Sequence, residues 1–369
     1  MTAQDVTLAL CGDIMLGRGV DQILPHPVDP QLYEDHASSA LDYVALAERA
    51  NGTIPRPAGF GYVWGDALAA LEGAQPDLRI ANLETSITKD GGAERKGINY
   101  RMNPDNVPCL TAAKLDCCAL ANNHVLDWGR AGLIDTLDSL QRAGIRFAGA
   151  GKDDVQAAAP AICDIPSKGR VLVFAFGTES SGIPARWSAT TGRPGVNFLP
   201  DLSSSTVGRI ADHVARLRGP GARLVASIHW GGNWGYDVPH EQQRFARELI
   251  DRAGFDVVHG HSSHHPKGIE VHRGKLILYG CGDFLNDYEG VTPYEPYRDD
   301  LAVAYLPRLS LDDGTLVECE LLPFRIRNFR LGRADKTDVA WLQKTLDREG
   351  TWFGTRLVLD RSRLVLRWR

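Results

Sequence analysis

The sequence lacks a long apolar run, a signal-peptide layout and any cysteine pair with metal-ligand spacing. None of its apolar stretches approaches the ~20 residues that a membrane-spanning helix needs. The N-terminal residues lack the charged-then-apolar order of a signal peptide, so we expect a cytoplasmic protein with no membrane partner. The 7 cysteines form no Cys-x-x-Cys pair, which argues for reduced thiols and against a zinc ribbon.

An excess of positive charge is also missing. With 41 basic and 46 acidic side chains the formal net charge is −5, which excludes a globally basic nucleic-acid binder. Hydrophobic residues make up 43% of the 369 residues and charged residues 24%, the composition of an ordinary globular protein. This length allows a sizeable core in one or two domains. It gives no indication of the oligomeric state.

Short apolar runs that end in small or polar residues recur along the chain. They span residues 6–10, 78–81, 115–121, 171–176, 224–228, 257–259 and 276–279. Apolar residues at helical spacing separate several of them, as in 133–140 and 245–253. This alternation predicts an α/β fold with sheets covered on both faces. Residues 25–66 and 178–205 are rich in Pro, Gly and Ser, and we expect loops or small excursions over the sheet's edge there.

Carboxylate, amide and imidazole side chains follow five of these runs. They are Asp13, Glu84, Asn123 with His124, His229, and His261 with His264. In open α/β sheets, sites form beyond the carboxyl ends of the strands. A lone Asp or Asn there is usually a turn residue or a helix cap, but five strand ends in succession are unlikely by chance. Oxygen and nitrogen ligands without thiolates predict a divalent cation such as Mn, Fe, Zn or Ca.

The motifs at these strand ends resemble those of the capsule-biosynthesis CapA family. They are Gly-Asp-Ile-Met-Leu-Gly-Arg (12–18), Asn-Leu-Glu-Thr (82–85), Ala-Asn-Asn-His-Val-Leu-Asp-Trp-Gly (121–129), His-Trp-Gly (229–231) and Gly-His-Ser-Ser-His (260–264). The resemblance covers roughly residues 5–290. It implies a calcineurin-like metallophosphoesterase sandwich, with two β-sheets flanked by helices. The ligands it implies are Asp13, Glu84, Asn123, His229, His261 and His264, with His124 at the position of the catalytic histidine.

The chain departs from the phosphoesterase pattern in its first and last motifs. Met15 stands where the first motif has a histidine, and a thioether cannot replace that ligand for a hard cation. The last motif has two residues instead of one between its histidines. We therefore expect one well-formed metal site, held by Glu84, Asn123, His229 and His261. Asp13 and His264 then serve either as ligands or as acid–base groups.

After residue 300 the pattern changes to short apolar runs at 301–306, 315–322 and 356–359, with a helical pattern at 339–346. We expect residues 1–300 to form the metal-site domain and residues 301–369 a β-rich extension packed on it. The Arg-rich residues 361–369 alternate with apolar ones, as in a half-exposed final strand.

His124 and Asp127 stand three apart, so they can share a helix face and pair as an acid–base group. The alternative is that Asp127 only caps the following helix. Asp13 and His264 could form a second pair. Two acid–base groups that flank a metal-polarised carbonyl would permit epimerisation at a Cα, whereas one base and a water would give amide hydrolysis.

The lead prediction is a metal-dependent enzyme that epimerises a residue of a peptide substrate. It follows from a resemblance to the soluble lasso-peptide epimerase branch of the family, which inverts the C-terminal tryptophan of a ribosomal precursor peptide. Hydrolysis of γ-glutamyl or related amides, as in capsule and poly-γ-glutamate handling, is the alternative. A phosphoesterase and a metal-less binding protein remain further alternatives.

Four residues near the motifs could hold that substrate. Trp230 and Trp234 could stack on an aromatic side chain, although core packing is the alternative. Arg18 and Arg101 could receive a terminal carboxylate in bidentate fashion, although salt bridges on the protein itself would explain them equally.

Overall fold

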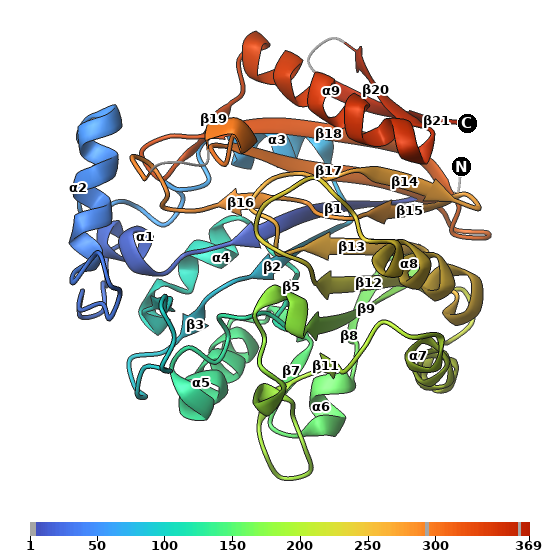
Figure 1. Ribbon diagram of the computed structural model, residues 1–369, viewed down its shortest axis with the longest axis horizontal. Coiled ribbons are helices and arrows are strands. Elements are labelled where there is room, and N and C mark those ends of the chain that lie inside the picture. The colour runs from blue at the N-terminus through green and yellow to red at the C-terminus, as the bar shows by residue number, and fades with distance from the viewer. Residues whose placement is uncertain (1–4, 292–294, 361–362) are drawn as a thin grey trace.

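Two large β-sheets form the centre of the computed structural model, which describes residues 5–291, 295–360 and 363–369 (Figure 1). The first sheet has ten strands. In order they are β20 (Thr355–Asp360), β21 (Arg363–Trp368), β18 (Leu316–Ile326), β17 (Leu301–Ser310), β1 (Asp5–Ile14), β2 (Leu78–Leu83), β5 (Cys117–Ala119) and β6 (Arg146–Ala148), with β16 (Asp283–Leu285) beside β1 and β19 (Leu331–Arg333) beside β18.

The second sheet has seven strands. Its order is β11 (Phe198–Leu199), β9 (Gly169–Thr178), β12 (Arg223–His229), β13 (Val257–His261), β15 (Lys275–Leu278) and β14 (Ile269–His272), with β8 (Ala161–Ile165) beside β9. Two short pairs complete the strands: β3 (Ser86–Ile87) with β4 (Arg101–Met102), and β7 (Ala150–Gly151) with β10 (Gly195–Val196).

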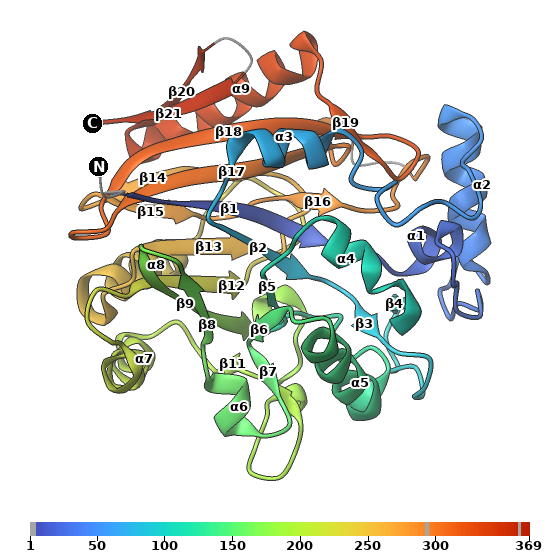
Figure 2. The same cartoon turned by 180° about the vertical axis from the view of Figure 1, so that it is seen from behind.

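Helices cover the outer faces of both sheets (Figures 1 and 2). The α-helices are α1 (Arg18–Ile23), α2 (Ala40–Asn51), α3 (Asp66–Ala74), α4 (Pro108–Ala112), α5 (Gly129–Arg142), α6 (Asp154–Ala158), α7 (Ser204–Leu217), α8 (His240–Ala253) and α9 (Lys336–Gly350). Short 3-10 helices are η1 (Pro104–Asn106), η2 (Glu179–Ser181), η3 (Ala185–Trp187), η4 (Glu295–Tyr297) and η5 (Thr351–Phe353). No helix in the described ranges combines the length and apolar character needed to cross a membrane.

The alternation of side chains along the inner strands explains the layers. In β9, Val173 and Ala175 belong to the core shared with the first sheet, whereas Leu172 and Phe174 pack with α7 and α8. Successive residues of a strand point to opposite faces, so a strand between two apolar layers is apolar throughout. The α/β fold expected from the continuous apolar runs, and the two-sheet sandwich that the family resemblance implies, are therefore confirmed.

The structure adds detail to two of the sequence-based expectations. Residues 25–66 combine loops with helix α2, which Ser39 and Asp42 begin with a capping box. The strands after residue 300 extend the first sheet, since β17 pairs antiparallel with β1 and β18 pairs with β17. Residues 361–362 lie outside the described ranges, and β21 follows them.

Candidate active site

Side chains with metal-binding chemistry gather where parallel strands of both sheets end. β1, β2 and β5 run parallel in the first sheet, as do β12 and β13 in the second, so their carboxyl ends point the same way. These ends supply Asp13 in β1, Glu84 after β2, Asn123 and His124 after β5, His229 in β12 and His261 in β13. All of these residues except Asn123 are buried.

A further carboxylate, Asp283, reaches the same place through a close approach of two chain segments. A Cβ on Gly12 would lie 1.8 Å from the carbonyl oxygen of Gly282, so only glycine fits where the segments meet. The amide of Asp13 donates to that oxygen at 3.1 Å, and β1 and β16 pair Asp13 with Asp283. Asp283 was missing from the predicted ligands, although the same sequence, Cys-Gly-Asp, ends at both carboxylates.

One group of candidate ligands combines a carboxylate with two imidazoles. Ligand atoms of Asp13, His229 and His261 lie within 4.8 Å of one another. Nε2 of His229 is 3.0 Å from Oδ1 of Asn123, and Nε2 of His261 is 2.9 Å from the Ser227 hydroxyl. Burial lowers the pKa of both histidines well below the usual value, which favours the neutral imidazole that binds metal ions.

A second group consists of carboxylates alone. Ligand atoms of Asp13, Glu84 and Asp283 also lie within 4.8 Å of one another. Burial, and next the charge of Asp283, raise the pKa of Asp13 to about 7. Burial, followed by the charges of Asp13 and Asp283, raises the pKa of Glu84 well above its usual value. A divalent cation would compensate this repulsion, so the donor set fits the predicted cation. One well-formed site was expected, whereas the ligand atoms form two groups that share Asp13.

His124 and Asp127 form the hydrogen-bonded pair that their spacing suggested. Nδ1 of His124 lies 2.6 Å from Oδ2 of Asp127, and the ring stacks on Tyr100 with centroids 3.9 Å apart. Asp127 also accepts from the Tyr100 amide at 2.6 Å, and α5 begins without a side-chain cap, so capping does not explain this carboxylate. Nε2 of His124 faces the metal centre, 3.9 Å from Oε1 of Glu84.

Lys96, between β3 and β4, completes this pair and was not predicted. Its Nζ donates to Oδ1 of Asp127 at 2.7 Å and to the carbonyl oxygen of Asn123 at 2.5 Å. Burial lowers the pKa of His124 to about 4. The Asp127 charge acts to raise this pKa, whereas the Lys96 charge acts to lower it. No motif marks Lys96, because it reaches the site from an irregular segment far along the chain.

His264 pairs with a different carboxylate from the one expected. Its Nδ1 lies 3.0 Å from Oδ1 of Asp283, whereas Asp13 accepts from the Ser262 amide at 3.0 Å. The expected Asp13–His264 pair is thus replaced by an Asp283–His264 pair, because β16 brings the second carboxylate alongside. Burial favours the neutral form of His264, but the charges of Asp283 and Asp13 outweigh it and raise the pKa.

The structure does not support a substrate-binding role for Arg18. Its guanidinium is buried between Asp287, with an Nε–Oδ2 distance of 2.9 Å, and Glu34, with an Nη1–Oε1 distance of 3.1 Å, so its charge is already paired. Arg101 is more accessible and stacks on the Trp128 ring at 3.7 Å.

The two predicted tryptophans lie in different environments. Trp230 is 2% exposed, and its Nε1 donates to the Tyr279 carbonyl at 3.0 Å, so it belongs to the core. Trp234 is half-buried beside the acid–base residues, with its ring centroid 5.1 Å from that of His264 and 5.4 Å from that of Tyr297. Of this pair, Trp234 is the one whose ring contacts a predicted acid–base residue.

Comparisons with known proteins cover the candidate ligands and both imidazole–carboxylate pairs. The family model for the bacterial capsule synthesis protein PGA_cap matches residues 7–288. A probable polyglutamine synthesis accessory protein of Mycobacterium tuberculosis is 49% identical over 362 residues, which cover 98% of this chain and 95% of that protein. The PGA biosynthesis protein CapA of Bacillus subtilis is 27% identical over 81% of this chain and 67% of its own length.

More distant similarities extend to a second capsule protein and a solved structure. The capsule biosynthesis protein CapA of Bacillus anthracis is 24% identical, over 88% of this chain and 68% of that protein. The crystal structure of a novel phosphatase from Mycoplasma pneumoniae aligns with a TM-score of 0.49 and 9% identity, over 91% of this chain and 96% of that chain.

Proposed function

Because this chain belongs to the bacterial capsule synthesis protein family PGA_cap, we propose that it is a metal-dependent enzyme that hydrolyses amide bonds in a glutamyl peptide or polymer. The relatives named for polyglutamine synthesis and PGA biosynthesis support this substrate class. The observation that carries the proposal is that two groups of buried ligands share the carboxylate of Asp13, and that the His124–Asp127 pair lies beside Glu84 of one group.

The residues that would hold a divalent cation are the two groups that meet at Asp13. The imidazoles of His229 and His261 provide nitrogen ligands on one side, and Glu84 and Asp283 provide oxygen ligands on the other. A cation bound there would supply a Lewis acid beside the reacting carbonyl.

His124 is suited to move the proton that amide hydrolysis requires. Asp127 holds its Nδ1 and therefore directs Nε2 toward the ligands, where Nε2 can accept a proton from the attacking water and return it to the leaving amine. The stacked Tyr100 ring keeps the imidazole in this plane. Because His124 is neutral, it can act first as the base.

Epimerisation at a Cα is the second candidate, and a specific arrangement favours it. The His124 and His264 pairs are linked through two tyrosines, since Tyr100 stacks on His124, Tyr288 lies edge-on to His264, and the tyrosine hydroxyls are 3.0 Å apart. Two such pairs could remove a proton from one face of a Cα and return one to the other. We rank hydrolysis first because Asp283, the partner of His264, also belongs to a candidate ligand group.

One pair of incubations distinguishes these reactions. Mn²⁺-loaded protein is incubated with a short γ-glutamyl oligomer in ¹⁸O-water and in deuterated water, and the products are analysed by mass spectrometry. Hydrolysis predicts shortened chains with one ¹⁸O in each new carboxyl group, whereas deuterium at Cα of an intact chain would indicate epimerisation. Intact, unlabelled chains would contradict both candidates. The His124→Gln variant is the control for adventitious metal-catalysed cleavage.

A further inference from the structure

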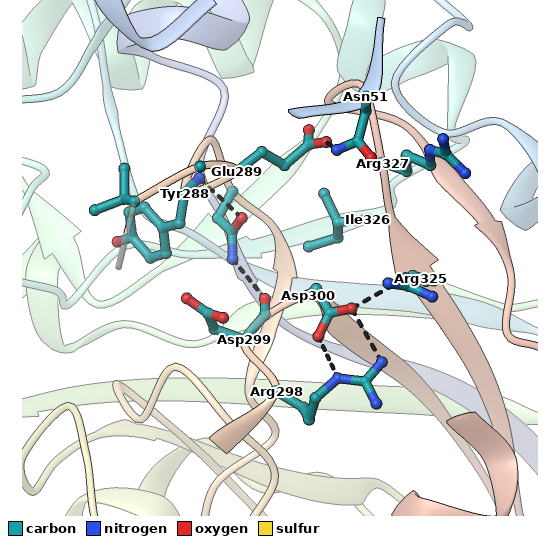
Figure 3. A pocket seen from close by; sticks show the side chains of 12 residues that line it. Asn51, Tyr288, Glu289, Arg298, Asp299, Asp300, Arg325, Ile326 and Arg327 are labelled. Carbon is teal, nitrogen blue, oxygen red and sulfur yellow. Dashed lines mark hydrogen bonds and ion pairs between the residues drawn. The ribbon is translucent and has the colours of Figure 1, made fainter. Parts of the chain in front are cut away.

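A pocket of about 320 Å³ adjoins the candidate metal centre (Figure 3). Its volume is at the lower end of the roughly 300–1,000 Å³ found for small-ligand pockets. Asn286 forms the wall between the pocket and the metal centre, since its Nδ2 donates to Oδ2 of Asp283 at 2.8 Å and to the Asp299 carbonyl at 3.0 Å. Tyr288, which also lines the pocket, has its ring edge-on to His264 with centroids 5.3 Å apart.

Most charged groups of this pocket already have partners. Arg298 binds Asp300 through Nε at 2.7 Å, and Nε of Arg325 lies 3.0 Å from the same carboxylate (Figure 3). Glu289 accepts from the Asn51 side chain at 2.6 Å. These contacts hold the arginines in place but use only part of their five N–H donors each.

Two lining side chains remain without such a partner. Within the described ranges, neither the Asp299 carboxylate nor the Arg327 guanidinium forms a hydrogen bond or ion pair with another residue's side chain. Figure 3 shows Asp299 on the side of Tyr288 and Arg327 on the other side of the pocket. The pocket therefore presents an acceptor for a cation on one side and donors for an anion on the other.

We propose that this pocket binds the free amino-terminal residue of a γ-glutamyl chain, with its α-ammonium group against Asp299 and its α-carboxylate against Arg327 and Arg325. The substrate class rests on the proposed function. In a γ-linked chain only this terminal residue carries both groups, because the nitrogen of every other residue belongs to an amide. Its γ-carbonyl extends away from the Cα, toward the wall shared with the metal centre. The protein thus acts from the chain end.

Binding measurements test this assignment without relying on turnover. Calorimetric titrations of the full-length, Mn²⁺-loaded protein compare a γ-glutamyl trimer with its N-acetylated form. Acetylation removes the ammonium charge, and we expect it to weaken binding by about tenfold or more, the usual size for a charged hydrogen bond. Asp299→Asn should weaken binding of the free trimer to the same extent and leave the acetylated trimer unaffected. Arg327→Gln should weaken binding of both.

Matched variants on exposed surfaces, Asp312→Asn and Arg216→Gln, should change neither affinity. Equal affinities of the two trimers for the unmodified protein would overturn the proposal, as would an Asp299→Asn variant that weakens both trimers equally. Amine-selective binding without any cleavage or exchange would leave the pocket assigned and contradict the proposed function. Cleavage of both trimers at equal rates and with equal affinities would support the proposed function and contradict the assignment of the pocket.

Discussion

Two buried imidazole–carboxylate pairs flank the candidate metal centre, and the pKa values of their histidines are shifted in opposite directions. Nδ1 of His124 lies 2.6 Å from Asp127, and Nδ1 of His264 lies 3.0 Å from Asp283. Burial lowers the pKa of His124 to about 4 against the influence of Asp127. At His264 burial acts in the same sense, but the Asp283 and Asp13 charges outweigh it and raise the pKa.

The neighbours of each pair account for this difference. Lys96 binds Asp127 and shares its negative charge, so less of that charge stabilises the imidazolium of His124. His264 instead faces Asp13 and Asp299 in addition to its partner. Both pairs consist of an imidazole and a carboxylate. Because their surrounding charges differ, His124 is a neutral base whereas His264 is a charged acid.

The largest effect should come from Asp13, which lies beside the second pair and belongs to both ligand groups. Asp13→Asn should reduce the hydrolysis rate by about a thousandfold or more, because the Lewis acid is lost with its shared ligand. Metal content measured by mass spectrometry should fall in parallel. A variant that keeps both its metal and its rate would remove the basis for the proposed centre.

Exchanging each histidine tests the comparison directly. His124→Gln should lower kcat by roughly 10²–10⁴, the contribution typical of a general acid–base group, while the protein retains its metal. His264→Gln should cost less, about ten- to a hundredfold, because this residue supports Asp283 and does not start the reaction. Initial rates and metal content of the two variants give the answer. Equal losses of rate would show that the pairs are not differentiated.

The buried carboxyl group of Asp13, near the His264–Asp283 pair, should make the stability of the metal-free protein depend on pH. The pKa of Asp13 rises from 3.8 to about 7 on folding, so between these values the folded state keeps a proton that the unfolded state has lost. Stability of the metal-free protein should therefore fall as pH rises through this window.

A cation that binds only the folded state, at one hundred times its Kd, should restore about 2.7 kcal/mol above pH 7. Thermal unfolding with and without Mn²⁺ across this range is the measurement. A melting temperature that rises with pH in the metal-free protein would contradict the assignment of Asp13.

The smallest effect should come from Lys96. Lys96→Met should raise the pKa of His124, because a cation that opposes its protonation is removed, and the acid limb of the kcat/KM profile should move to higher pH. Above that limb the rate should change by less than about tenfold. Lys96→Arg, which keeps the charge, should leave the profile in place. A Met variant with an unshifted acid limb would show that Lys96 does not tune this pair.

Local sequence patterns predicted those site residues that lie at the ends of strands. Sites in open α/β sheets form beyond the carboxyl ends of the strands, so Glu84, His229 and His261 could be assigned to one edge from the apolar runs that they follow. The parallel pairing of β12 with β13 then places the two histidines opposite each other. The capping box that begins α2 was not recognised, because the surrounding Pro and Gly residues favoured loops or small excursions there.

Contacts between distant segments could not be predicted in this way. Asp283 joins the ligands only because two glycines allow β1 and β16 to approach closely, and Arg18 is occupied only because Asp287 returns beside it. Lys96 reaches Asp127 through a long side chain whose position no periodicity fixes. The positions of such side chains are determined by tertiary packing, which the pattern of apolar runs does not predict.

The metal centre itself is tested most directly by anomalous diffraction from crystals soaked in Mn²⁺. The account predicts a Mn²⁺ peak within bonding distance of Asp13 and of ligands from at least one of the two groups, with His124 adjacent to it but unbound. An ordered active site with no peak at Asp13, or a Mn²⁺ ion bound only elsewhere on the protein, would contradict it.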